Sequence, residues 1–161
     1  MDTVTQLEQR AERKNKIRLT YQLPVIALTL NIPANLTHQA WVPMLFKSAL
    51  DSFLDKMEEM EVNVIEQQFA TTPIYEALFA VDIHSSTLLK KAAIEIEHTH
   101  PYGALFNFDV MCRQGITISR RSSYMRPRPC LICDDTAQRC AAMKRHSPNR
   151  IEQAIMQFIN T

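Results

Sequence analysis

The spacing of hydrophobic and polar residues changes several times along the chain, and each change predicts a new element. Residues 22–32 are crowded with apolar and β-branched side chains, which predicts a central strand. From a possible N-cap at Thr37, apolar residues recur at helical spacing as far as Met60, with Pro43 tolerable only in the first turn. Residues 3–18 are rich in Glu, Gln, Arg and Lys, which predicts an exposed helix ahead of the strand.

The middle of the chain predicts a hairpin followed by a second helix. Two strand-like runs, 62–71 and 74–83, are separated by a Thr-Pro pair that favours a turn. Ser85 or Ser86 can then cap a helix, whose apolar residues face one side until Pro101 ends it.

The last third of the chain predicts two further strands and two helices. Residues 104–112 alternate between apolar and polar side chains, and the chain turns at Gly115 and returns through Ile118. Residues 134–144 and 149–159 have helical spacing and complete the chain.

The order of these elements is β-α-β-β-α-β with an added strand, which predicts an α+β fold. The pattern is typical of a ferredoxin-like split βαβ antiparallel sheet with its helices on one face. We expect a single domain over residues 1–161, with an N-terminal helix (1–20), an α+β core (21–121) and a helical tail (122–161) tethered by a Cys/His cluster.

Composition narrows the class of protein. The chain has 161 residues, 46% hydrophobic and 22% charged, which suits one globular domain whose core can stand without disulfides. No signal peptide or membrane span is visible, so we expect a cytoplasmic protein with reduced cysteines. The common Gly-rich phosphate loop, the G-x-S-x-G elbow and the H-E-x-x-H metalloprotease motif are absent from the sequence.

Charge is distributed unevenly although the whole chain carries only +1. Residues 113–150 hold nine basic side chains against two acidic ones, whereas residues 51–100 hold ten acids against three lysines. A cluster of arginines can bind phosphates through paired N–H donors, which suits a polyphosphate ligand or nucleic acid. The alternative is a solvated basic surface. Nucleic acid is disfavoured because Tyr124 is the one aromatic residue in the basic segment, and base-stacking platforms need more.

A group of soft ligands lies in the basic segment: Cys130, Cys133, Cys140 and His146. Two cysteines separated by two residues can grip one tetrahedral ion, and a later Cys and His can complete its coordination. The spacing therefore predicts a structural zinc site. The alternative is a pair of reduced cysteines beside a helix that carries an unrelated Cys and His.

A second group of polar residues spans a helix end and the strand after it. Glu95, Glu97 and His98 end the helix, and Asn107 and Asp109 share one face of the strand because alternate residues of a strand point the same way. Carboxylates on one face can hold Mg2+ against phosphate oxygens. Helix-end acids and histidines are also common on solvated surfaces, so both interpretations stay open.

Taken together, these motifs resemble one family. IEIEHTHPYG (94–103), ISRR (118–121) and R-x-C-L-x-C (128–133), with the Cys and His that follow, resemble the citrate lyase holo-acyl-carrier-protein synthases. These are also called apo-citrate lyase phosphoribosyl-dephospho-CoA transferases. R-x-E-R from Arg10 to Arg13 and N-I-P (31–33) are similar to the family's N-terminal elements.

The resemblance implies a transferase. Family members attach a group from triphosphoribosyl-dephospho-CoA to a serine of the acyl carrier subunit of citrate lyase and release pyrophosphate. It further implies that Asp109 binds Mg2+ and that Glu95 or Glu97 is a second metal ligand or a base, with His98 also in the catalytic site. The residues that it implies for substrate binding are three arginines and one glycine: Arg120, Arg121, Arg128 and Gly103.

Some positions depart from the family pattern. Ala34 stands where a glycine is usual, Ala104 replaces an arginine, and Asn107 replaces the first Asp of a D-x-D pair. The cysteines and histidine of the predicted zinc site are intact. A weakly active or non-catalytic relative that binds a carrier protein or a CoA-like ligand is therefore the alternative function.

Overall fold

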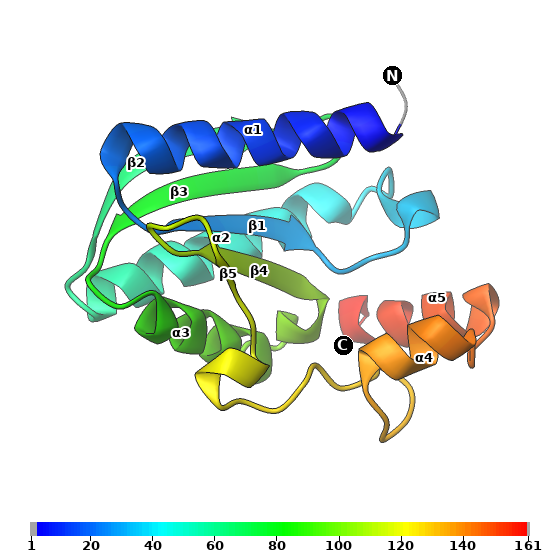
Figure 1. Cartoon of the computed structure of the whole chain (residues 1–161). Coiled ribbons are helices and arrows are strands. Elements are labelled where there is room, and N and C mark those ends of the chain that lie inside the picture. Colours follow the sequence, from blue (N-terminus) through cyan, green and yellow to red (C-terminus); the bar gives the residue numbers. More distant parts are fainter. Residues whose placement is uncertain (1–2, 161) are drawn as a thin grey trace.

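The computed structural model describes residues 3–160, which form a mixed α and β structure (Figure 1). Its main elements follow in chain order: α1 (Thr3–Tyr21), β1 (Val25–Leu30), α2 (Val42–Glu59), β2 (Asn63–Ala70), β3 (Glu76–Asp82), α3 (Ser86–Thr99), β4 (Phe106–Met111), β5 (Thr117–Ile118), α4 (Ala137–Met143) and α5 (Pro148–Ile159). Short 3-10 turns, η1 (Ala34–Leu36), η2 (Gly103–Leu105) and η3 (Arg121–Ser123), lie between them.

The strands form one open antiparallel sheet in the order β2-β3-β1-β4-β5. The predicted α+β class, the hairpin of β2 and β3, and the added fifth strand are confirmed. β5 is short and pairs only with Val110 and Met111 of β4. The ferredoxin-like assignment stays a prediction.

α2 and α3 cover one face of the sheet and build the main core. Phe53 of α2 packs between Phe79 of β3 and Phe108 of β4, with ring centroids 4.6 and 5.9 Å away. All three rings are fully buried. Ile26 and Leu28 of β1 point into the same core, as the alternation of a strand requires.

The opposite face of the sheet is covered by α1, which corrects the expectation that this N-terminal helix is exposed (Figure 1). Ile17 of α1 is buried against small and β-branched residues of the sheet, including Val25, Ala27 and Ala80. The other described side chains of α1 are exposed or only partly buried, so the charged composition of this helix gave no indication that it packs on the sheet. The signal lay in β1 itself, which is apolar on both faces because both are covered.

The helical tail also packs onto the main core. Ala154 and Ile155 of α5 are buried, and Ile155 belongs to the main core. Thr136 and Ser147 cap α4 and α5 by accepting hydrogen bonds from backbone N–H groups in the first turns. Within residues 3–160, no helix has the length and apolar character needed to cross a membrane.

Candidate functional site

A row of polar side chains crosses the α1 side of the sheet. Asn107 of β4 donates from its amide to Thr29 Oγ1 and to Asp109 Oδ2, both at 3.1 Å. Asn107 and Asp109 are half-buried and share one face of β4, as the alternation predicted. The amide of Asn107 therefore fixes one oxygen of the Asp109 carboxylate.

Two side chains of α3 complete the edge of β4 that β5 leaves uncovered. Glu97 Oε2 accepts a hydrogen bond from the Phe108 N–H at 3.0 Å, and Lys90 Nζ donates to the Phe108 carbonyl at 2.7 Å. Both side chains are buried, with Lys90 7% and Glu97 5% exposed. Backbone N–H and C=O groups at a sheet edge normally bond to water or to another strand. Here they bond to Lys90 and Glu97 instead, and these contacts hold α3 against β4.

Two arginines from the segment after β5 converge on the same carboxylate. Arg120 pairs with Glu97 Oε1, and Arg128 Nη2 lies 3.1 Å from Glu97 Oε2. Arg128 also donates to the carbonyls of Ala104 and Phe106. The basic segment predicted from the sequence is thus drawn onto α3 and β4, and Glu97 orients both guanidinium groups.

The electrostatic balance of this site is positive. Lys90, Arg120 and Arg128 stand against Glu97 and Asp109, so cations outnumber carboxylates among these five groups. Burial lowers the pKa of Lys90 and of Arg128, and the nearby charge of Glu97 opposes the shift in both. A partly desolvated set of N–H donors with excess positive charge is suited to bind phosphate oxygens.

The polar row continues toward α1 through a buried glutamate. Arg10 Nε and Arg13 Nη2 pair with the carboxylate of Glu76 at 2.7 and 3.0 Å, and Glu76 is 2% exposed. Glu76 precedes Ala77, the partner of Leu28, so the register places it across from Thr29. The R-x-E-R motif of α1 therefore faces the same side of the sheet as Asp109.

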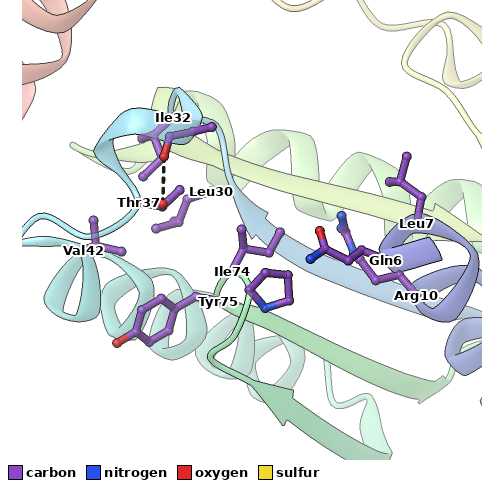
Figure 2. Close-up of a pocket in the computed structure, with 11 residues that line it drawn as sticks. Gln6, Leu7, Arg10, Leu30, Ile32, Thr37, Val42, Ile74 and Tyr75 are labelled. Atoms are coloured by element: carbon purple, nitrogen blue, oxygen red, sulfur yellow. Dashed lines mark hydrogen bonds between the residues drawn. The ribbon is translucent and has the colours of Figure 1, made fainter. Parts of the chain in front are cut away.

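Arg10 also borders a cavity of about 430 Å3 between the start of α1 and the ends of β1 and β3 (Figure 2). The walls are mainly apolar, with Leu30, Ile74 and Tyr75 among them. Gln6 and Arg10 reach toward it from α1 in Figure 2. Arg10 and Ile32 belong to the R-x-E-R and N-I-P motifs, but their spacing in the sequence did not show that the two motifs meet at a cavity.

The sequence interpretation missed Lys90, Thr29 and Glu76. Each is a buried polar or charged side chain, and two of them carry a charge inside an apolar pattern. Lys90 follows Leu89 in the buried face of α3, and Glu76 opens the buried strand β3. Charged residues are rarely buried unless they are paired. A charged residue at a position that the apolar pattern predicts to be buried was therefore the sequence feature that could have identified Lys90 and Glu76.

Other predicted site residues lie apart from Asp109. Glu95 points to α2, where it pairs with Lys56 at 2.9 Å. His98 is exposed, with its Nε2 3.1 Å from Arg120 Nη1, so it borders the site. Arg121 is exposed in η3. Their roles in catalysis and substrate binding stay predictions.

Gly103 has a packing reason of its own. A Cβ at this position would lie 2.3 Å from the carbonyl oxygen of Glu97 and 2.6 Å from that of Ile96. Only glycine permits this approach of the chain to the end of α3. The predicted substrate contact of Gly103 stays a prediction beside this structural role.

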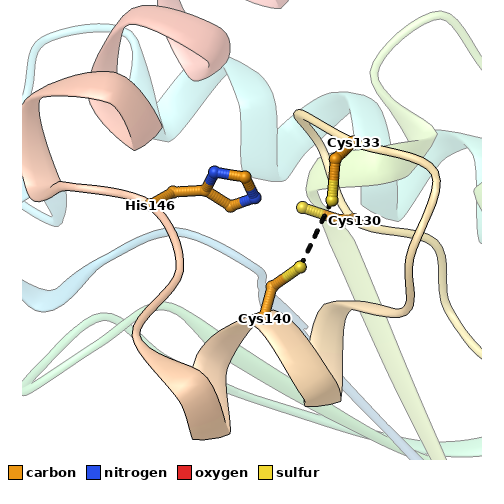
Figure 3. Close-up of side chains that lie close together, drawn as sticks. All are labelled: Cys130, Cys133, Cys140 and His146. Atoms are coloured by element: carbon orange, nitrogen blue, oxygen red, sulfur yellow. Dashed lines mark hydrogen bonds between the residues drawn. The ribbon is translucent and has the colours of Figure 1, made fainter.

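The predicted metal ligands do come together. The ligand atoms of Cys130, Cys133, Cys140 and His146 all lie within 4.8 Å of one another. In Figure 3 the imidazole of His146 points toward the three sulfur atoms. Sulfur ligands of one tetrahedral zinc are about 3.8 Å apart, and Cys133 Sγ lies 3.4 Å from Cys140 Sγ.

The thiol pKa values and one unpartnered nitrogen atom at this cluster are suited to a bound cation. The backbone N–H of Asp135, with the Cys140 thiol and His146, lowers the pKa of Cys133 to about 6, whereas burial raises that of Cys140 to about 11. Within residues 3–160, Nε2 of His146 is buried without a hydrogen-bond partner. A thiolate-forming group and an unpartnered imidazole nitrogen are the donors that a metal uses.

Comparison with known proteins identifies the family of this chain. The profile of the family described as apo-citrate lyase phosphoribosyl-dephospho-CoA transferase matches residues 2–161. A protein of Vibrio cholerae named "Probable apo-citrate lyase phosphoribosyl-dephospho-CoA transferase" is 28% identical over 145 residues, covering 87% of this chain and 79% of that protein. The Citrobacter koseri protein of the same name, without "Probable", is 28% identical over 141 residues, covering 87% and 76%.

A third relative is longer. "Protein CitXG" of Haemophilus influenzae is 26% identical over 149 residues, which cover 92% of this chain and 32% of that protein. The matched region thus also occurs as part of a larger chain. Since the family profile covers nearly every residue, and the Vibrio cholerae and Citrobacter koseri proteins match over most of their length, this chain belongs to the apo-citrate lyase phosphoribosyl-dephospho-CoA transferase family.

Proposed function

We propose that this chain transfers the phosphoribosyl-dephospho-CoA group from its triphosphate precursor to a serine of the acyl carrier subunit of citrate lyase. One observation carries the proposal within this family: Lys90, Arg120 and Arg128 converge on β4 beside the half-buried Asp109, whose charge acts on Lys90 and Arg128. Such an arrangement suits a polyphosphate substrate.

The proposed step is a displacement at phosphorus. The serine oxygen forms a bond to the α-phosphorus, the bond from that phosphorus to the oxygen bridging to the β-phosphorus breaks, and pyrophosphate leaves with the bonding electrons. The serine proton passes to a base or to water. Negative charge grows on the departing oxygens, and Arg120 and Arg128 would stabilise it from fixed positions.

Asp109 is the carboxylate that we propose for Mg2+, with Asn107 beside it as a neutral oxygen ligand. One carboxylate combined with phosphate oxygens is a usual way to hold this ion, which neutralises phosphate charge when bound. Asn107 already holds Asp109 Oδ2 through its amide, so the second oxygen of Asp109 is the better placed ligand atom.

Glu97 fits a positioning role better than that of a base. Both of its oxygens bond to arginines, and one also accepts the Phe108 N–H. These contacts occupy both oxygens, so neither is free to take the serine proton. We infer that Glu97 sets the spacing of Arg120 and Arg128, which would then contact the phosphates with their remaining N–H groups.

We also propose a structural zinc ion at Cys130, Cys133, Cys140 and His146. It would join the loop after Arg128 to α4 and to the start of α5, and so hold the arginine-bearing segment in place. Thiolate ligands of this kind persist in a reducing compartment, which accords with a cytoplasmic location.

The direct test uses purified protein, apo-carrier subunit, the triphosphate donor and Mg2+. The carrier should gain the mass of one prosthetic group on its serine, with one pyrophosphate released for each group transferred. A carrier whose serine is replaced by alanine is the control. Pyrophosphate release without a change in the carrier's mass would show hydrolysis instead of transfer.

The alternative is a relative that binds the carrier or a CoA-like ligand without transfer. It is favoured by Asn107 and Ala104, which remove a carboxylate and a guanidinium from the positions where the family uses them. Saturable binding of dephospho-CoA with no modification of the carrier, under conditions in which a relative from Citrobacter koseri is active, would select this function.

A further inference from the structure

The cavity whose lining residues Figure 2 shows has the volume and the lining of a ligand site. Its volume of about 430 Å3 falls in the range of small-molecule sites. Its mouth carries Leu7, a large apolar side chain that is 54% exposed on the first turns of α1. Leu30, Ile74 and Tyr75 line the inside, and polar groups are few, with Gln6 and Arg10 among them.

A series of neighbouring polar residues leads from the cavity to the proposed phosphate-binding site. Arg10 borders the cavity and pairs with Glu76, and the register places Glu76 across from Thr29, which accepts a hydrogen bond from Asn107. Glu76 and Asn107 lie on strands β3 and β4, on either side of β1. Two interstrand spacings separate them, which is about 10 Å.

The charge along this path is favourable for phosphate. Arg10 and Arg13 share the single carboxylate of Glu76, so one positive charge remains uncompensated in this group. A ligand that extends from the cavity toward Asp109 would pass over that excess charge. Its end in the cavity would be largely apolar, because the lining is, and its other end would be anionic.

We propose that the cavity binds the adenosine portion of the dephospho-CoA donor and so directs its triphosphate toward Asp109. The inference rests on the proposed function, because that function supplies the donor. A purine offers a broad apolar ring to Leu30, Ile74 and Tyr75 and a polar edge to the Gln6 amide. The ribose and phosphates then span the distance to β4.

The test compares two substitutions on one helix. Leu7→Trp places an indole at the mouth of the cavity, whereas Leu19→Trp places the same group at a 63% exposed position near the other end of α1. Both positions are exposed, so both variants should unfold at nearly the temperature of the parent. Calorimetry with dephospho-CoA should show affinity reduced by tenfold or more, about 1.4 kcal/mol, for Leu7→Trp and unchanged for Leu19→Trp.

A second pair of measurements guards against indirect effects. Ile74→Trp fills the cavity from the turn before β3 and should reduce affinity in the same way. Phosphopantetheine, which lacks the adenosine, should bind Leu7→Trp and Ile74→Trp as it binds the parent protein. Equal losses for both probes would overturn the assignment to adenosine.

The remaining outcomes separate this inference from the proposed function. If transfer proceeds while Leu7→Trp and Ile74→Trp bind dephospho-CoA as the parent does, the cavity does not hold the nucleoside and the transferase function stands. If these variants lose affinity for the apo-carrier but not for dephospho-CoA, the cavity is a protein contact and the inference is overturned. If no transfer occurs but both variants lose dephospho-CoA affinity, the inference stands and the transferase function fails.

Discussion

Glu97→Gln should destabilise the protein strongly, because Glu97 is the anion that allows three cations to be packed together. Its side chain is 1% exposed, and those of Arg120 and Arg128 are 10% and 20% exposed. Removing one partner of a buried ion pair costs about 3–5 kcal/mol. Because both arginines keep some contact with water, we expect the lower end, about 3 kcal/mol.

The neighbouring Glu95 provides a matched control. Glu95 lies two residues earlier on α3, but its side chain is 58% exposed and pairs with Lys56 at 2.9 Å. Exposed ion pairs contribute about 0–1 kcal/mol, so Glu95→Gln should change stability by no more than that. The two variants differ from the parent by the same chemical group and the same helix propensity, which isolates the effect of burial.

Urea unfolding followed by circular dichroism should give the free energy of unfolding of both variants. For a chain of this size, 1 kcal/mol shifts the melting temperature by about 2–4 °C, so Glu97→Gln should melt about 6–12 °C below the parent. A loss below about 1 kcal/mol, or equal losses for Glu95→Gln and Glu97→Gln, would refute the claim that Glu97 anchors Arg120 and Arg128.

Three further predictions concern the metal, a histidine and the arginines. Metal analysis should find about one zinc per chain, lost in His146→Ala and retained in Cys112→Ser; metal-free parent protein under reducing conditions would contradict this. Burial lowers the pKa of His100, whose Nδ1 accepts a hydrogen bond from the Tyr102 N–H at 3.0 Å. As the pH falls, the unfolded chain therefore binds a proton at His100 before the folded protein does, and the stability of the fold should decrease below about pH 6.5. Between about pH 7.5 and 5.5, the melting temperature of His100→Gln should decrease less than that of the parent. An equal decrease would contradict the claim that His100 causes this pH dependence. Arg128→Ala should weaken dephospho-CoA binding about tenfold and Arg121→Ala by much less, whereas equal losses would place the phosphates elsewhere.

The elements and the metal cluster were accessible from the sequence because each depends on short-range patterns. The alternation of residues 104–112 placed Asn107 and Asp109 on one face, and the structure has them there. Cys130, Cys133, Cys140 and His146 lie within one short segment, so their spacing alone predicted that they meet.

The remaining features depend on contacts between distant segments, which spacing does not reveal. Arg10 reaches Glu76 across 66 residues, and Lys90 reaches the Phe108 carbonyl only because β4 forms an uncovered edge. α1 was expected to be exposed because Ile17 is the one buried side chain among residues 5–21 of a charged helix. The role of Glu97 likewise became visible only when η3 and the segment after it brought two arginines onto it.

The most direct test of the central claim measures transfer to the apo-carrier subunit in the presence of Mg2+ for the parent, Asn107→Asp and Asp109→Ala. We predict measurable transfer by the parent, a faster metal-dependent rate for Asn107→Asp because a carboxylate holds Mg2+ better than an amide does, and no transfer by Asp109→Ala. Rapid transfer by the parent that Asp109→Ala leaves unchanged would contradict the account and move the catalytic site away from this face of β4.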